Sequence, residues 1–227
     1  MRLLSIETAT SVCSVAVHRD GHCEGHTDLE DGMAHSRELG SITEKLLHQL
    51  HLNTRDLDAV IVSKGPGSYT GLRIGVSFAK AICYAQEIPL IGINTLEILA
   101  SAAISERPGD HYYCPMIDAR RMEVYRAIYD QDLKEIETTS PLIVEGNSFD
   151  YLKGDKKIVL FGNGMEKCKD VLGEDDSFIY LDNVKLSARF SGTIGKRKYD
   201  RGEFEDLAYF EPFYLKSFQA KPSKKLL

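Results

Sequence analysis

The stretch AVIVSKGPGSYTGLRIG, residues 59 to 75, combines an apolar run, a glycine-rich loop and the start of a second apolar segment. AVIVS predicts a short buried strand, and GLRIGVSFAKAICYAQE predicts the helix that follows the loop. Gly65 and Gly67 would let backbone N–H groups approach an anion closely, and the hydroxyls of Ser68 and Thr70 stand at the predicted helix start. The loop is therefore a candidate phosphate site.

Two well-known nucleotide loops do not fit this stretch. A phosphate-binding loop of the Walker type needs a lysine after its last glycine, and here Gly71 is followed by Leu72. A dinucleotide fingerprint needs the spacing G-x-G-x-x-G, and the last glycine comes one residue too late. A tight structural turn without any ligand therefore stays open as the alternative.

The helix after the loop carries a stripe of very small residues. Gly71, Gly75 and Ala79 recur every four residues, with Arg73 beside them. Because glycine inside a helix costs about 1 kcal/mol relative to alanine, Gly75 calls for a compensating contact. A neighbouring element could approach this stripe closely, and it could belong either to the domain's own sheet or to another subunit.

The N-terminus offers a second candidate phosphate site. The strand LLSIE ends in Glu7 and leads into Thr8-Ala9-Thr10-Ser11. In phosphotransferases of the actin and sugar-kinase type, a strand ends in an acid that positions magnesium, and a turn rich in glycine and hydroxyl groups binds phosphate. Here Ala9 stands where a glycine would allow the closest approach, so the site is a weakened version.

The pattern along the first half predicts a mixed sheet with helices on its faces. Strands are expected within residues 2 to 27, with a hairpin at Asp20-Gly21. An amphipathic helix from Ser36 to Leu50, a strand at 89 to 94 and a helix from Thr95 to Ile104 follow. The order β-β-β-α-β-α-β-α combines a meander with crossover connections.

The second half repeats this organisation more weakly. We expect a first subdomain over residues 1–107, ending at a turn-prone break, and a second over residues 108–227 with a basic tail. YYCPMID and EVYRAIY predict a hairpin, and KIVLFGNG predicts a strand before a glycine turn and the helix MEKCKDVL. A further helix is expected over 186 to 198.

Composition limits the function classes. The 227 residues are 43% hydrophobic, and no run approaches the roughly 20 apolar residues of a membrane span. The N-terminus lacks the apolar character of a signal peptide, so we expect a cytoplasmic protein whose five cysteines are reduced. The net charge of −6 argues against broad nucleic-acid binding. His18, His22 and His26 are expected on the surface.

Five blocks of the sequence together resemble the TsaB (YeaZ) family, which assists the synthesis of threonylcarbamoyladenosine in tRNA. The blocks are IETATSVCSVAV, AHSRELGSITEKLL, the segment DLDAVIVSKGPGSYTGLRIG with the helix that follows, MIDARRMEVYRAIY and FEPFYLKSF. The resemblance implies an actin-like α/β fold with two subdomains on mixed sheets. It also implies a non-catalytic accessory subunit that binds the catalytic paralogue TsaD, allows a TsaE-like ATPase to dock, and meets tRNA only through the complex.

The resemblance also bears on metal and partner sites. The paralogue carries two metal-binding histidines in the context N-H-L-E-A-H, and the matching positions here are Thr95 and Leu99, so no metal is expected. No cofactor is required, with at most weak ATP or ADP binding at Thr8, Thr10 and the loop residues. The family is thought to pair, with TsaD or with a second copy, through two helices. Carried onto this chain, the contact residues are Ser36, Leu39, Ile42, Leu46, Gly71, Arg73, Gly75 and Ala79.

A small ATP-binding phosphotransferase or ATPase that uses Glu7, Thr10 and the glycine loop is the alternative from a different class. A metallopeptidase finds no support, because neither the histidine pair nor an H-E-x-x-H run occurs.

Overall fold

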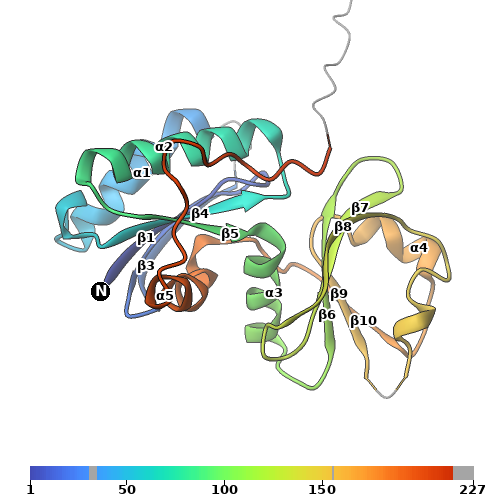
Figure 1. The fold of residues 1–227 in the computed structure, drawn as a ribbon. Coiled ribbons are helices and arrows are strands. Elements are labelled where there is room, and N and C mark those ends of the chain that lie inside the picture. The colour runs from blue at the N-terminus through green and yellow to red at the C-terminus, as the bar shows by residue number, and fades with distance from the viewer. Residues whose placement is uncertain (31–34, 155, 217–227) are drawn as a thin grey trace, which may run out of the picture.

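The computed structural model describes residues 1–30, 35–154 and 156–216, which form two α/β subdomains side by side (Figure 1). The first is built on a five-stranded sheet with the strand order β3-β2-β1-β4-β5. Its strands are β1 (Arg2–Glu7), β2 (Cys13–Arg19), β3 (His22–Leu29), β4 (Ala59–Gly65) and β5 (Leu90–Asn94). The first three pair antiparallel, while β1, β4 and β5 run parallel, as the mixed-sheet prediction requires.

Helices cover both faces of this first sheet. α1 (His35–Gln49) and α2 (Tyr69–Gln86) lie on one face, and α3 (Thr95–Glu106) and α5 (Gly192–Asp200) lie on the other (Figure 1). The short 3-10 helices η1 (Thr54–Asp56) and η4 (Ala188–Phe190) complete this half. The predicted hairpin is confirmed, with Asp20 and Gly21 at φ values of 54° and 88°. None of the described helices is long and apolar enough to cross a membrane.

The second subdomain has its own mixed sheet, in the order β10-β9-β6-β7-β8. Its strands are β6 (Tyr112–Asp118), β7 (Glu123–Tyr129), β8 (Glu135–Ile143), β9 (Ile158–Phe161) and β10 (Phe178–Leu181). Its short helices are η2 (Asp150–Leu152), η3 (Glu166–Cys168) and α4 (Lys169–Leu172). The hairpin of β6 and β7 and the strand β9 are confirmed. β8 and β10 were not expected, and the helix predicted at MEKCKDVL is only η3 and α4.

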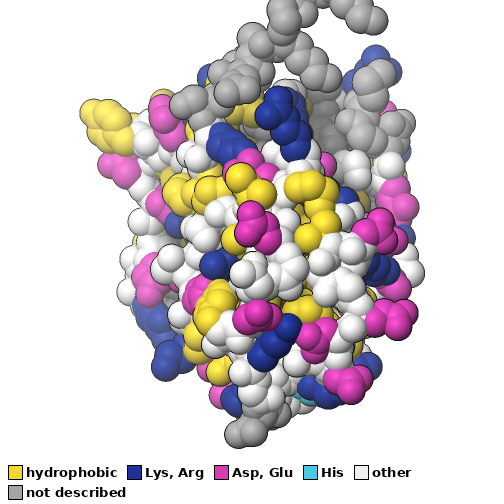
Figure 2. All heavy atoms as spheres, turned by 90° about the vertical axis from the view of Figure 1, so that its right-hand side faces the viewer, with side chains coloured by type: hydrophobic (Ala, Val, Ile, Leu, Met, Phe, Trp, Pro, Cys, Tyr) yellow, Lys and Arg dark blue, Asp and Glu magenta, His cyan; other side chains and the backbone are white. Residues whose placement is uncertain are grey.

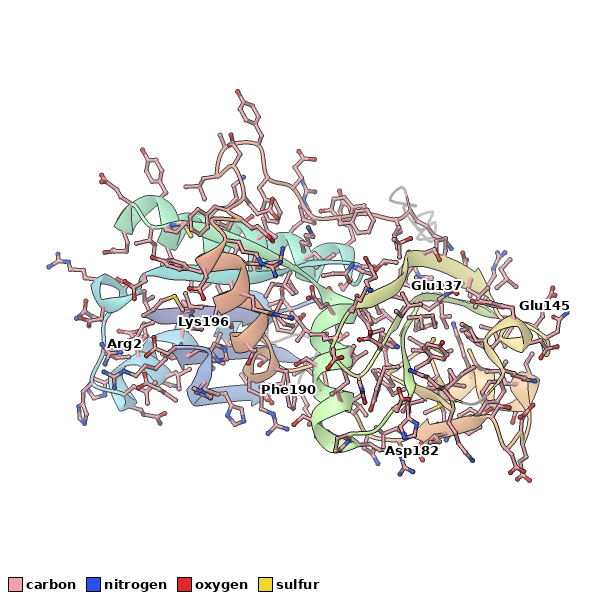
Figure 3. The ribbon with its side chains drawn as sticks, turned by 60° about the horizontal axis from the view of Figure 1, so that its bottom comes forward. Arg2, Glu137, Glu145, Asp182, Phe190 and Lys196 are labelled. Atoms are coloured by element: carbon pink, nitrogen blue, oxygen red, sulfur yellow. The ribbon has the colours of Figure 1, made fainter. Side chains whose placement is uncertain are left out.

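The chain returns to the first subdomain after β10. Figure 3 shows Asp182 in the second subdomain, Phe190 at the junction and Lys196 beside the first sheet. The helix expected over 186–198 is thus two pieces, η4 and α5, and α5 packs on β1 and β5. The break expected near residue 107 coincides with the end of α3, and the exact division into subdomains stays a prediction.

α3 lies between the two sheets and joins them through one core. Ile98 and Leu99 belong to a buried cluster that includes Ile61 of the first sheet and Tyr113 and Phe161 of the second. Separating the subdomains would expose these side chains to water, at about 25 cal/mol for each Å² of apolar surface. The two subdomains therefore share one buried core.

His18 contradicts its expected place on the surface. Its ring is completely buried in β2, and glycine at position 192 of α5 makes room for it, since a Cβ there would overlap the ring. Burial lowers the pKa of His18 to about 4. The expectation was wrong because α5, which covers this position, comes from the other end of the chain.

Candidate functional site

The glycine loop between β4 and α2 is closed by contacts with its own chain. A Cβ added at Gly67 would lie 2.5 Å from the carbonyl oxygen of Ala9, and one added at Gly65 would lie 2.6 Å from that of Phe213. Gly65 also has a φ of 113°, a conformation that favours glycine. The two glycines therefore allow other backbone segments of this chain to approach the loop closely. This agrees with the alternative that the loop is a tight structural turn.

The polar groups of the loop are also occupied. The N–H of Ser68 donates to the carbonyl oxygen of Ala9 at 2.7 Å. The Ser68 hydroxyl caps α2 by accepting from the N–H of Gly71 at 3.2 Å. Thr70 is exposed in the first turn of α2. The N–H and the hydroxyl of Ser68 thus already have partners within the chain, and binding of a phosphate at this loop stays a prediction.

The turn after β1 packs against the start of α2. Thr8 is buried, and its hydroxyl donates to the carbonyl oxygen of Gly71 at 2.8 Å. Glycine is needed at Gly71 and Gly75 because a Cβ at either position would overlap Thr8. Among the six residues predicted for a nucleotide or phosphate, Thr8 thus packs on α2 at Gly71 and Gly75, while Gly67 and Ser68 contact its neighbour Ala9.

Glu7 ends β1 beneath this contact and is completely buried. One carboxyl oxygen accepts from the N–H of Ala9 at 2.7 Å and from the Ser63 hydroxyl at 2.9 Å. The other oxygen has no hydrogen-bond partner among the described residues. Burial raises the pKa of Glu7 to about 7, despite the opposing effect of these hydrogen bonds. A carboxyl group with this pKa is ionised in only about half of the molecules near pH 7.

A small pocket opens between the subdomains, where the turn after β1 faces the turn after β9. Its volume is about 240 Å³. Thr10 and Ser11 contribute hydroxyls, Asn163 contributes an amide, and Leu99 and Ile117 form part of its apolar lining. This volume lies just below the roughly 300–1,000 Å³ of pockets for drug-sized ligands. Thr10 is the predicted ligand residue that reaches it.

The two positions that correspond to the paralogue's histidines lie on α3. Thr95 is fully buried, and its hydroxyl has no hydrogen-bond partner in the described part of the chain. Leu99 is 2% exposed and lines the small pocket. Within residues 1–30, 35–154 and 156–216, no group of three or more His, Cys, Asp or Glu side chains could hold a metal ion. Of these two positions, Leu99 thus contributes an apolar side chain to the small pocket.

The predicted partner-binding residues face the interior of this chain. Six of the eight are buried: Leu39, Ile42 and Leu46 of α1, and Gly71, Gly75 and Ala79 of α2. The leucines and the isoleucine pack in the core beneath α1, together with Ala79. The prediction that these six side chains touch another subunit is corrected, because their own sheet and Thr8 already cover them.

The two remaining predicted contact residues differ. Arg73 is exposed on α2, where its guanidinium lies 5.2 Å from the centre of the Tyr69 ring and donates to the Tyr69 hydroxyl at 3.1 Å. Ser36 belongs to α1, and its side chain lies outside the described part of the structure. For these two, the contact with another subunit stays a prediction.

A second stripe of small residues lies on the opposite face of α2 and was missed. Ser77, Ala81 and Ala85 are exposed and recur every four residues. We call them the outer stripe. Tyr84, beside it, is 80% exposed, an unusual state for so large an aromatic side chain. The outer stripe has the same four-residue spacing in the sequence as the predicted stripe of Gly71, Gly75 and Ala79.

The end of the described chain, residues 203–216, crosses α2 and then reaches the second subdomain (Figure 1). We call it the C-terminal strap. The N–H of Glu205 donates to the carbonyl oxygen of Leu90 at 2.9 Å, and that of Phe213 donates to the carbonyl oxygen of Lys64 at 2.6 Å. The ring centre of Tyr214 lies 4.7 Å from that of Tyr69. The strap therefore covers the glycine loop, which no sequence pattern indicated.

Comparisons with known proteins agree on one family. A family model described as "TsaD: tRNA N6-adenosine threonylcarbamoyltransferase" matches residues 31–175. The "tRNA threonylcarbamoyladenosine biosynthesis protein TsaB" of Escherichia coli is 31% identical over 225 residues, 96% of this chain and 95% of that protein. Its counterpart in Bacillus subtilis is 32% identical over 202 residues, 86% of this chain and 82% of that protein. The likeness in sequence thus extends over nearly the whole chain.

The likeness in fold also extends over nearly the whole chain. "YeaZ from Pseudomonas aeruginosa" superposes with a TM-score of 0.80 over 94% of this chain and 99% of that chain, at 23% identity. This likeness confirms the expected fold class, an actin-like α/β fold whose two subdomains are each built on a mixed sheet.

Proposed function

Because the chain belongs to the TsaB family of tRNA threonylcarbamoyladenosine biosynthesis proteins, we propose that it acts there as a non-catalytic scaffold for a TsaD-like catalytic paralogue. The paralogue would carry out the transfer to tRNA, and this chain would bind and stabilise it. A TsaE-like ATPase would join once the pair has formed. tRNA would be held by the assembled complex, since a chain of net charge −6 attracts polyanions poorly by itself.

The outer stripe of α2 is the observation that carries this proposal. The exposed side chains Ser77, Ala81 and Ala85 are so small that a helix of a partner could approach the backbone of α2 closely. Ile74 and Phe78 are half-buried beside them and packed against the core under α2, so a partner would extend an existing apolar surface. A stable interface needs about 1,000 Å² of buried area, and a helix of 18 residues with its neighbours can supply one side of it.

The geometry also supports the non-catalytic part of the proposal. Ser68 of the glycine loop, which the alternative phosphotransferase would use, instead donates its N–H to the carbonyl oxygen of Ala9 in the turn after β1. Leu99, at one of the two positions that the resemblance matches to the paralogue's histidines, is apolar and lines the small pocket. In the absence of the paralogue, the outer stripe of one copy would meet that of a second copy, which gives a homodimer through the same face.

An arginine at Ala81 tests the proposal. Ala81 is exposed, so Ala81→Arg should leave the fold intact and place a long charged side chain across the outer stripe. We expect at least a tenfold loss of affinity for the organism's own TsaD-like protein, measured by calorimetry with the purified chains. Ser105→Arg is the matched control, because Ser105 is an exposed position of α3, on the other face of the sheet.

Wild-type chain that shows no binding to the paralogue would overturn the scaffold proposal. If Ala81→Arg binds the paralogue as the wild type does, the scaffold role is kept, but the proposed contact through the outer stripe of α2 is rejected. Threonylcarbamoyl transfer to tRNA by the purified chain alone, at enzyme-like rates, would overturn the non-catalytic role. ATP turnover by the chain alone would favour the alternative phosphotransferase class.

A further inference from the structure

A second pocket lies between the two subdomains and is lined mainly by charged and polar side chains. It has a volume of about 300 Å³ and forms where β4, β5, α3 and α5 meet the hairpin of β7 and β8. Glu97 lines this pocket, whereas Leu99, two residues further along α3, lines the small pocket. Because residues two apart in a helix point in nearly opposite directions, the two pockets lie on different sides of α3. We call the second one the charged pocket.

Charged side chains from four elements converge on the charged pocket. Lys64 of β4 and Lys198 of α5 bring ammonium groups, and Glu97 of α3 and Glu135 of β8 bring carboxylates. On the outer side of the second subdomain, by contrast, acidic and basic side chains are interspersed over an open surface (Figure 2). Charges that face a partly enclosed volume act more strongly on a bound ion than charges surrounded by water. The charged pocket is therefore better suited to a small ionic ligand than that surface.

Three of these charged groups lack a hydrogen bond. Among the described residues, neither the carboxylate of Glu97 nor that of Glu135 accepts one, and the ion pair of Glu97 with Arg197 spans 3.9 Å. The ammonium of Lys64 lies 3.7 Å from the carboxylate of Glu205 on the C-terminal strap, beyond hydrogen-bond distance. Lys198, by contrast, is paired with the strap at 3.0 Å. The pocket thus offers two carboxylates and one ammonium group to a ligand.

The two carboxylates act on each other. The side chain of Glu97 is 21% exposed, and burial raises its pKa. The negative charge of Glu135 raises the pKa of Glu97 further, and three nearby cations oppose the shift, namely Lys198, Arg197 and Lys64. Carboxylates that lie close together repel each other, and a positively charged group between them removes this cost. This end of the pocket therefore favours a ligand with an ammonium group.

The uncharged wall of the pocket is held in place by hydrogen bonds between the subdomains. The amide nitrogen of Asn94 donates to the hydroxyl of Thr139 at 2.7 Å, and its amide oxygen accepts from the N–H of Leu96 at 2.8 Å. Tyr129 is 2% exposed, and its hydroxyl is hydrogen-bonded to Thr139. Leu133 adds an apolar side chain. The wall is thus formed before a ligand arrives, which lowers the cost of binding.

We propose that the charged pocket binds a free amino acid, with the ammonium group of the ligand between Glu97 and Glu135 and its carboxylate at Lys64. An amino acid carries both charges on one carbon atom, so a single small ligand can form charge-assisted hydrogen bonds at both ends. Its side chain would lie against Leu133. The pocket lies within this chain, so the inference is independent of the proposed scaffold role.

Other ionic ligands fit the same groups less well. A phosphate would be repelled by the two carboxylates. A divalent metal ion takes more protein ligands than two carboxylates provide, and the described side chains contain no group of three or more His, Cys, Asp or Glu that could hold one. An organic amine without a carboxylate would leave Lys64 unused, and the experiment distinguishes it from an amino acid.

Calorimetric titration of the purified chain with each of the standard L-amino acids tests for binding. We expect a dissociation constant of about 1 mM or lower for at least one of them. The strongest binder is then compared with two analogues, one without the α-carboxylate and one without the α-amino group. Each analogue should bind about tenfold more weakly or worse, because it loses the charge-assisted hydrogen bonds at one end.

Two variants test whether binding takes place in the charged pocket. Glu97→Gln and Glu135→Gln each remove a negative charge with little change in shape, so each should weaken binding by about tenfold. Glu135 is exposed, so Glu135→Gln tests the site even if Glu97→Gln alters the packing of α3. Glu106→Gln is the matched control, because Glu106 is an exposed carboxylate at the other end of α3. It should bind as the wild type does.

Weaker binding by the pocket variants, with an unchanged control, supports the proposal. Absence of binding by every amino acid at millimolar concentration overturns it, and so does binding that Glu97→Gln and Glu135→Gln leave unchanged. If the analogue without a carboxylate binds as tightly as the amino acid, the proposal is also overturned, and the pocket is assigned to organic amines. All titrations use the chain alone, so a failure of the proposed scaffold role would leave their results unaffected.

Discussion

The two faces of α2 carry the same pattern of small residues and have opposite surroundings. On the inner face, Gly71, Gly75 and Ala79 are covered by the turn after β1 and by the core. On the outer face, Ser77, Ala81 and Ala85 are exposed. Small residues at a four-residue spacing predict that another element can approach the helix closely, but they do not predict which element it is. On the inner face the residue that approaches α2 is Thr8, which lies more than 60 residues away from Gly71 in the sequence.

The sharpest test of this comparison is the same substitution on both faces. Gly75→Val would push a branched side chain into Thr8 and break its hydrogen bond to Gly71. We expect a loss of about 4 kcal/mol in the free energy of unfolding, from overpacking together with the lost hydrogen bond. Ala81→Val should cost only the helix propensity of valine, about 0.6 kcal/mol. Denaturant unfolding of both variants measures the difference.

A second substitution identifies the cause of the loss. Thr8→Ala removes the group that Gly75→Val meets, so the double variant should recover at least about 1 kcal/mol relative to the sum of the single effects. Additive effects, or equal losses from Gly75→Val and Ala81→Val, would contradict the assignment of the inner stripe to Thr8.

The inner side also predicts a pH dependence through Glu7. Its pKa is raised from an ordinary value of 4.5 to about 7, so the folded state binds more protons than the unfolded state between these pH values. Stability from this group is fully present below pH 4.5 and is lost as pH rises through 7. The shift corresponds to about 3 kcal/mol. Glu7→Gln, which cannot ionise, should therefore gain about 3 kcal/mol relative to wild type between pH 4.5 and 8.

Unfolding free energies of the wild type and Glu7→Gln, measured in parallel across this pH range, provide the test. The difference between the two proteins cancels the contributions of all other titrating groups to the free energy of unfolding. One of these is His18, whose lowered pKa makes the folded state more stable as pH rises through the acidic range. A difference that does not change with pH would show that the Glu7 carboxyl is not buried beneath α2.

The sequence predicted the elements around α2 far better than their contacts. The periodicities of β4, α2 and the N-terminal hairpin are local, and the structure confirms them. The roll of α2 about its axis depends on Thr8 and on the sheet beneath it, so the buried stripe could not be told from the exposed one. β8 was missed because its alternation is weak and Pro141 interrupts it, which an edge strand tolerates.

The candidate sites show the same limit. Gly65 and Gly67 were correctly singled out as positions of close approach, but the groups that approach are Phe213 of the C-terminal strap and Ala9. The strap has no hydrophobic period of its own, and main-chain hydrogen bonds to distant residues fasten it, so no local pattern could reveal it. The absence of metal ligands at Thr95 and Leu99 came from the resemblance alone, and no structural principle would have selected those two positions.

The smallest expected effect concerns Gly40, on the exposed side of α1. A Cβ added there would have its nearest neighbour, the ring of Phe78 on α2, at 3.9 Å, which is ordinary contact. Gly40→Ala should therefore raise the free energy of unfolding by about 0.5–1 kcal/mol, the propensity difference in an exposed helix. The same change at the buried Gly75 should lower it. If Gly40→Ala also weakens binding to the paralogue, close approach of a partner explains why α1 keeps a glycine where alanine is more stable. If binding is unaffected, the contact is confined to α2 and the outer stripe acts without α1.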